Sequence, residues 1–173
     1  MSLDVIAIGD SNVDLIVTVK GFPVRGGNAY VDSFEKIAGG TAGNFAVAAS
    51  RLGLRTGLVS KIGNDEYGRF FKADLEMEGV DISHLLTDKK AHTGWVFVVV
   101  DAQGERTFFA FRTNCADSLL RYEEIDMSYL RRARLIHVSG ILLTASESRK
   151  TILKVMEELK AAVSYTHLTL PTN

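Results

Sequence analysis

The chain has 173 residues, of which 46% are hydrophobic and 24% charged, with 20 Lys and Arg against 21 Asp and Glu. This composition is typical of one globular domain that can bury its own core. A net charge of -1 gives no electrostatic reason to expect nucleic acid or a membrane surface as partner. The single cysteine, Cys115, has no intrachain disulfide partner. No apolar run approaches the roughly 18 residues of a membrane span, and the N-terminus lacks the basic start of a secretory signal. We therefore expect a cytoplasmic protein.

Alternating strands and helices are predicted along much of the chain. The apolar run 5–8 predicts a strand buried on both faces, ending at Gly9, and residues 57–62 predict another. Apolar spacing predicts a helix over 41–52, and Asp65 is a plausible N-cap for a second helix that ends at Gly79. This order of elements predicts an α/β domain with a partly parallel sheet flanked by helices.

Two segments interrupt that order, near residues 12–37 and 93–112. The first alternates apolar and polar residues on both sides of a Gly-rich turn, and the second has two short apolar runs with no room for a helix between them. Each segment predicts a hairpin. We expect the two hairpins to form a small β insertion on the α/β domain.

The last ten residues, 164–173, differ in composition from the rest of the chain. They contain no Asp, Glu, Lys or Arg and follow a helix rich in Lys and Glu. One interpretation is a final strand. The other is that this tail is not native to the gene, as a frameshift or a joined read would produce.

The most specific motif is the run from Gly39 to Asn44, Gly-Gly-Thr-Ala-Gly-Asn, at a strand-to-helix junction. Glycines let a ligand approach the backbone, and the helix N-terminus offers unpaired N–H groups to a hydroxyl-rich or anionic ligand. The alternative is an ordinary turn. The spacing matches neither G-x-G-x-x-G nor G-x-x-x-x-G-K-[ST], which disfavours a dinucleotide-binding fold.

The wider pattern from Gly39 to Gly63 resembles the N-terminal signature of the ribokinase-like (PfkB) carbohydrate kinase family. It has two glycines, a small residue, Asn44, a small residue and two spaced glycines, Gly53 and Gly63. Residues 8–14 likewise resemble the family's opening strand and its sugar-binding Asp, and the two hairpins resemble its β lid. The resemblance extends from residue 4 to about 160. It implies a ribokinase-like α/β fold with a small β lid.

The resemblance also implies an activity. Members of the family transfer the γ-phosphoryl group of ATP, with Mg²⁺, to a hydroxyl of a small carbohydrate. The family's second signature, Gly-Ala-Gly-Asp, carries the general base and is absent from this sequence. We therefore expect residues 1–163 to be the N-terminal part of the domain, with the C-terminal half missing. Such a chain would be inactive alone and would bind neither ATP nor Mg²⁺ well. The rival hypothesis is a non-catalytic sugar-binding or dimerisation module, with a homodimer formed through the lid.

Four residues are candidates for the sugar pocket. An ionised Asp14 can accept hydrogen bonds from two neighbouring hydroxyls, each worth about 1.5–3 kcal/mol, although a residue of this kind can also simply cap a turn. By resemblance, Gly39, Gly40 and Asn44 line the pocket opposite Asp14. The Asn44 carboxamide can both donate and accept.

The second hairpin supplies further candidates. Phe97, Phe109 and Phe111 would give the lid an apolar surface that excludes water from the substrate, with ordinary sheet packing as the alternative. In family members that act on sugar acids, an Arg placed like Arg112 looks positioned to bind the substrate carboxylate. A surface Arg is the alternative for this residue. The four histidines show no metal-ligand spacing, so we expect no metal site in the chain.

Overall fold

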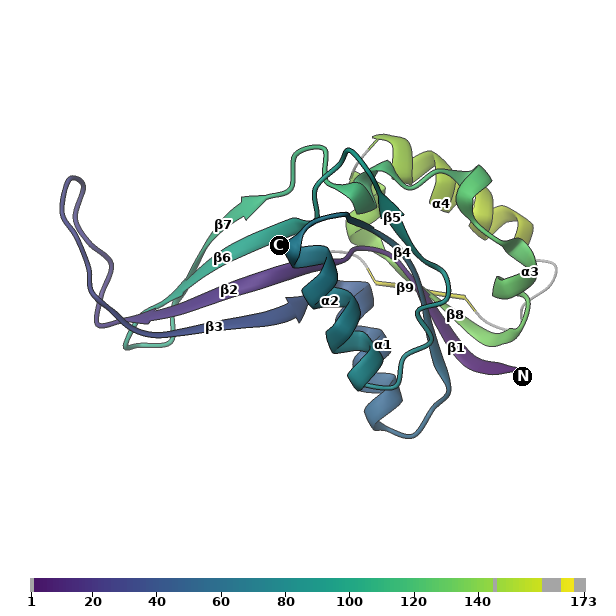
Figure 1. Cartoon of the computed structure of the whole chain (residues 1–173), viewed down its shortest axis with the longest axis horizontal. Coiled ribbons are helices and arrows are strands. Elements are labelled where there is room, and N and C mark those ends of the chain that lie inside the picture. The colour runs from purple at the N-terminus through teal and green to yellow at the C-terminus, as the bar shows by residue number, and fades with distance from the viewer. Residues whose placement is uncertain (1, 145, 160–165, 170–173) are drawn as a thin grey trace.

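The computed structural model describes residues 2–144, 146–159 and 166–169, and shows an α/β core from which a second sheet projects (Figure 1). The core sheet has five strands in the order β5-β4-β1-β8-β9. Every neighbouring pair in it is parallel. Its strands are β1 (Leu3–Ile8), β4 (Thr56–Gly63), β5 (Leu85–Asp88), β8 (Ala133–Ser139) and β9 (Thr166–Thr169). The predicted α/β class with a parallel sheet is confirmed.

Helices cover both faces of the core sheet, which is why its central strands are apolar on both sides. Helices α1 (Thr41–Arg51) and α2 (Glu66–Met77) lie on one face, and α3 (Met127–Leu130) and α4 (Ser146–Leu159) on the other (Figure 1). Strand β1 alternates between the two layers: Ile6 and Ile8 pack in the cluster with α3 and α4, and Ala7 packs in the cluster with α1 and α2.

The two long N-terminal helices begin in different ways. Asp65 caps α2 as predicted, and its Oδ1 accepts a hydrogen bond from the Gly68 amide at 2.8 Å. Gly40, at the N-cap of α1, has no side chain to offer. The Asp10 carboxylate, just beyond the end of β1, accepts from the Thr41 amide at 2.8 Å instead. The end of the first strand thereby fixes the start of the first helix.

The projecting sheet, which we call the lid sheet, consists of β2 (Asn12–Val19), β3 (Val31–Gly39), β6 (Gly94–Val100) and β7 (Arg106–Phe111) in the order β3-β2-β6-β7. Strands β2 and β3 form one antiparallel hairpin, and β6 and β7 form the other. Parallel pairing of β2 with β6 joins the two predicted hairpins into one sheet. Strand β3 runs two residues further than predicted, so that it leads directly into Gly40 and helix α1.

Among the described residues of the second half of the chain are three short 3-10 helices: η1 (Ala116–Leu119), η2 (Tyr122–Glu124) and η3 (Gly140–Thr144). The first two belong to the segment that returns from the lid sheet to the core. Of the tail 164–173, only β9 is among the described residues, and it pairs in parallel with β8. No helix in the described part of the chain is long and apolar enough to cross a membrane.

Candidate functional site

Polar side chains converge where β1 ends and the lid sheet begins. A pocket of about 300 Å³ opens there, between the N-terminus of α1 and one face of the lid sheet. Four of the predicted site residues, Asp14, Gly40, Asn44 and Arg112, line this pocket, whereas Gly39 is not among its lining residues. Its other lining residues are Asp10, Asn12, Thr41, Val96, Val98, Phe108 and Ile141.

Asp14 is half-buried on β2, facing Gly39 at the end of β3. A Cβ atom on residue 39 would lie 2.5 Å from Asp14 Oδ2, so only glycine leaves room for this carboxylate. The Asn12 carboxamide donates to Asp14 Oδ1 at 2.6 Å. Burial raises the pKa of the Asp14 carboxyl above its ordinary value, although the hydrogen bond from Asn12 and the positive charge of Arg112 both act to lower it. One oxygen of Asp14 is thus held in place beside the pocket.

Gly40 and Asn44 bring the N-terminus of α1 to the same pocket. Gly40 has a φ of +88°, and a Cβ there would lie 2.7 Å from the Asp10 carbonyl oxygen, so the chain turns here only with glycine. Asp10 is buried, and besides the Thr41 amide it accepts from Ser139 Oγ at 2.5 Å. Asp10 therefore fixes the floor of the pocket.

Arg112 directly follows β7, and its guanidinium is held from two sides. Nη2 donates to Asp117 Oδ2 at 2.7 Å, and Nη1 contacts Asn12 Oδ1 at 3.4 Å. Burial lowers the pKa of Arg112, but the charge of Asp117, the hydrogen bond to it and the neighbouring acidic groups Cys115 and Asp10 together raise the pKa above its ordinary value. Arg112 is therefore a fixed cation in the pocket wall and not a surface Arg.

The prediction that Phe97 and Phe109 face the substrate and exclude water from it is wrong. These two residues are paired across β6 and β7, so their side chains share one face of the lid sheet. Val98 and Phe108 are paired at the next position, and both line the pocket on the opposite face. Because side chains alternate along a strand, Phe97 and Phe109 point away from the pocket.

Phe111 belongs to the same outer face as Phe109. It lies opposite Trp95, with ring centroids 5.4 Å apart. The apolar run 108–111 has no polar residue to mark its outer side, so alternation of polarity gave no indication of which face the pocket uses. Phe108 is the aromatic residue of the pocket.

Asp10 and Asp117 also belong to the site and were not predicted. Asp10 follows a predicted buried strand, and ligands in α/β proteins bind beyond the carboxyl ends of such strands, so this rule would have found it. Asp117 lies in a 3-10 helix with no periodic pattern. Its role becomes visible only in the folded chain.

A larger groove of about 660 Å³ lies between α1, α2 and the end of β3. Its walls are mostly apolar. Two charged residues at its edge, Arg51 and Glu78, form an ion pair with each other. The smaller pocket is the better candidate site because carboxylates, a carboxamide, a guanidinium and a helix N-terminus converge there.

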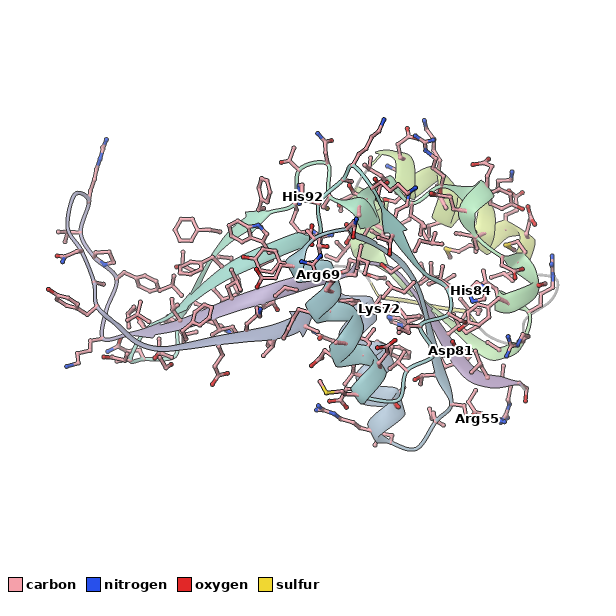
Figure 2. The ribbon with its side chains drawn as sticks, in the orientation of Figure 1. Arg55, Arg69, Lys72, Asp81, His84 and His92 are labelled. Atoms are coloured by element: carbon pink, nitrogen blue, oxygen red, sulfur yellow. The ribbon has the colours of Figure 1, made fainter. Side chains whose placement is uncertain are left out.

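His84 and His92 lie outside the pocket. Figure 2 shows His92 on the lid side of the core, and Asp81 and His84 on the side away from the lid. His92 Nε2 contacts the Thr113 carbonyl oxygen at 3.0 Å, while His84 stacks on Tyr129 at 3.6 Å between ring centroids. Within the residues that the structure describes, no group of three or more His, Cys, Asp or Glu side chains is arranged to hold a metal ion.

The sequence profile described as "pfkB family carbohydrate kinase" matches residues 2–170. This chain belongs to the pfkB family of carbohydrate kinases. It is 35% identical to the 5-dehydro-2-deoxygluconokinase of Halalkalibacterium halodurans, over 91% of this chain and 46% of that protein. It is 37% identical to fructokinase-1 of Zea mays, over 91% of this chain and 48% of that protein.

Solved structures agree with this pfkB assignment. An uncharacterized sugar kinase from Pyrococcus horikoshii, solved in complex with ATP, aligns with a TM-score of 0.82 at 30% identity, over 93% of this chain and 51% of that one. The chain thus spans about half the length of the pfkB relatives it matches. The ribokinase-like fold expected from the glycine signature is confirmed.

Proposed function

We propose that the protein to which this chain belongs is an ATP-dependent kinase of a small carbohydrate. Residues 1–163 would form the N-terminal part of its ribokinase-like domain and supply the sugar site and the lid. The observation that carries this proposal is the meeting of Asp14, Asn44 and the α1 N-terminus in one pocket under the lid sheet, in a pfkB chain. The relatives named as fructokinase and 5-dehydro-2-deoxygluconokinase support a sugar substrate.

Each pocket residue has a role suited to a sugar. The Asp14 carboxylate accepts hydrogen bonds from two neighbouring hydroxyls, and Asn44 donates to or accepts from a third. The absence of a side chain at Gly40 lets the sugar approach the backbone, and its absence at Gly39 leaves room for the Asp14 carboxylate. Phe108 covers the sugar and reduces the access of water, which competes as a phosphoryl acceptor. The remaining N–H groups of Arg112 complete the polar wall.

ATP and Mg²⁺ belong to the proposed reaction, but the residues described here do not fit them. No metal-binding cluster occurs among those residues, and the sequence contains no Gly-Ala-Gly-Asp motif. We therefore assign the binding of ATP and Mg²⁺ and the catalytic base to the part of the protein that this chain does not contain. This chain alone would hold the sugar without phosphorylating it. A kinase acts where ATP is supplied, which supports a cytoplasmic location.

A phosphorylation assay tests the proposal. The 173-residue chain and the product of the longer reading frame are each incubated with ATP, Mg²⁺ and a panel of pentoses, hexoses and sugar acids. We expect turnover only from the longer product, and genomic DNA beyond codon 163 should encode a Gly-Ala-Gly-Asp motif. In the longer product, Asp14→Ala should raise the KM for the sugar far more than the KM for ATP. Turnover of roughly 1 s⁻¹ by the short chain would contradict the assignment of the base.

A second candidate function is assembly through the lid sheet. Phe34 and Phe109 are each 60% exposed and lie on the outer face of that sheet, away from the sugar pocket. An exposed apolar face of this kind is typical of an association surface, which supports a homodimer. Sedimentation velocity of the wild type and of the Phe109→Ser variant tests it. A monomer at all concentrations for both proteins would contradict it.

A further inference from the structure

The charge of Arg112 is already balanced before any ligand binds. Its Nη2 atom donates to Asp117 at 2.7 Å, and the Asp117 side chain is completely buried. Asp117 also accepts from the Ser11 amide at 2.9 Å and from Cys115 Sγ at 2.8 Å. Arg112 after β7, Ser11 after β1 and Cys115 all donate to this carboxylate. It therefore cannot turn away to release the guanidinium.

The other charged side chains of the pocket are both acidic. Asp10 is bonded to the Thr41 amide and to Ser139, whereas the partner of Asp14 is the neutral Asn12 carboxamide. Three carboxylates thus surround one guanidinium, and the carboxylate that faces the pocket without a cation of its own is Asp14. The pocket therefore carries a negative charge at neutral pH.

We propose that this site selects an uncharged sugar over a sugar acid, and that Asp117 is the positioning residue that sets this selectivity by neutralising Arg112. The proposal rests on the proposed sugar site. A substrate carboxylate in the pocket would meet Asp14 without a free cation to compensate it. Hydroxyl groups can instead donate to Asp14 and accept from the N–H groups of Arg112 that Asp117 leaves free. Arg112 would then bind hydroxyls, in place of the carboxylate that the family resemblance implies.

Two matched ligand pairs test the selectivity. D-Fructose and 2-keto-D-gluconate differ in that the acid has a carboxylate where the sugar has one CH₂OH group, and D-glucose and D-glucuronate differ in the same way. Affinities are measured with the 173-residue chain by NMR titration at two salt concentrations. In whichever pair binds, we expect the neutral sugar to bind at least about tenfold tighter than the matching acid. This difference in affinity should shrink at high salt, because salt screens the repulsion between the acid and the pocket. Equal or tighter binding of the acid would overturn the proposal.

The Asp117→Asn variant tests the positioning residue. The amide oxygen can still accept from Ser11 and Arg112, but the negative charge is lost, so the ratio of neutral to acid affinity should fall about tenfold. Glu76→Gln is the matched control, because it removes the same charge at an exposed position of α2 and should leave the ratio unchanged. A folded Asp117→Asn variant with the wild-type ratio would overturn the role of Asp117. If that variant does not fold, the wild-type ligand pairs still decide the selectivity.

The result that overturns the proposed function is a different one. If neither the neutral sugars nor the acids bind to the chain or serve as substrates of the longer product, the sugar site itself is wrong. A preference for acids would leave the sugar site in place and overturn only the inference about charge.

Discussion

Asp14 and Gly39 lie so close across strands β2 and β3 that a Cβ atom on residue 39 would stand 2.5 Å from the Asp14 carboxylate. The same atom would stand 2.9 Å from Asn12 Nδ2. Glycine at position 39 therefore holds open the space in which the carboxylate and its partner meet. This contact joins the glycine motif to a residue that lies 25 positions earlier in the chain.

Gly39→Ala should mainly weaken sugar binding, whereas Gly40→Ala should mainly lower stability. At residue 39 the new methyl group meets side-chain ends that can move, so we expect a small loss of stability and a loss of sugar affinity of at least about tenfold. At residue 40 the φ of +88° and the Asp10 backbone oppose any side chain, so the free energy of unfolding should fall by about 1–3 kcal/mol or more. Urea denaturation and sugar titration measure the two effects. A destabilised but fully binding Gly39→Ala variant would contradict this account of the contact.

Phe108→Ala and Phe109→Ala form a matched pair, because the two side chains are almost equally exposed, at 59% and 60%. Only Phe108 lines the pocket. We expect Phe108→Ala to weaken sugar binding several-fold, with Phe109→Ala close to wild type. Titration of both variants with the same sugar is the measurement, and an effect confined to Phe109→Ala would show that the faces of the lid sheet are assigned the wrong way round.

The raised pKa of Asp14 predicts a pH dependence of binding. The ionised carboxylate is the form that accepts hydroxyl hydrogen bonds, so affinity should fall with decreasing pH, starting above the ordinary carboxyl value of 3.8. Asp14→Asn should abolish this dependence. Affinity measured between about pH 4 and 8 tests the prediction, and an identical pH profile in the variant would exclude Asp14 as its source.

The raised pKa of Asp14 also makes stability depend on pH. Affinity should rise with pH, whereas the free energy of unfolding should fall. Because the folded chain binds this proton more tightly than the unfolded chain does, Asp14 makes the free energy of unfolding decrease as pH rises from its unfolded pKa through its raised folded pKa. The Asp14→Asn variant should therefore gain stability relative to wild type across that window. Urea denaturation at several pH values measures the difference between the two proteins.

Asp65 should contribute to stability through both of its oxygens. Oδ1 caps α2 at the Gly68 amide, and Oδ2 accepts from the Thr93 amide at 2.7 Å, at the entry to β6. Asp65→Ala removes an N-cap worth about 1 kcal/mol and leaves the Thr93 amide unpaired at a cost of about 1–3 kcal/mol. Asp65→Asn should recover only part of this loss, because its single oxygen can accept from one of the two amides while its NH₂ group cannot accept from the other. Equal loss in both variants, measured by urea denaturation, would mean that the charge and not the geometry matters.

Local patterns in the sequence were sufficient to predict the core elements. The buried runs of β1 and β4, the apolar face of α1 and the Asp65 cap of α2 all depend on residues within one element. The parallel pairing of β2 with β6 does not, because it joins segments about 80 residues apart and no local pattern specifies it. The two hairpins and the small β lid that they form were therefore predicted, but the strand pairing that joins them was not.

The residues of the candidate site likewise fall into those that a local motif identifies and those that only the folded chain reveals. Asp14, Gly39, Gly40 and Asn44 were identified by motif because the same spacing recurs in a family. Asp117 was missed because its interactions with Ser11 and Arg112 depend on the folded chain. The choice of Phe109 over Phe108 failed because both faces of β7 carry exposed residues, so polarity gave no register.

Mapping a sugar onto the chain by NMR tests the central claim most directly. The ¹⁵N-labelled chain is titrated with the neutral sugar of highest affinity, and the amides that shift are assigned. We expect the shifts to cluster around Asn12, Asp14, residues 39–44 and Arg112, and to vanish in the Asp14→Ala variant. Shifts centred on the larger groove around Val47 and Leu52, or shifts that persist in Asp14→Ala, would contradict the account.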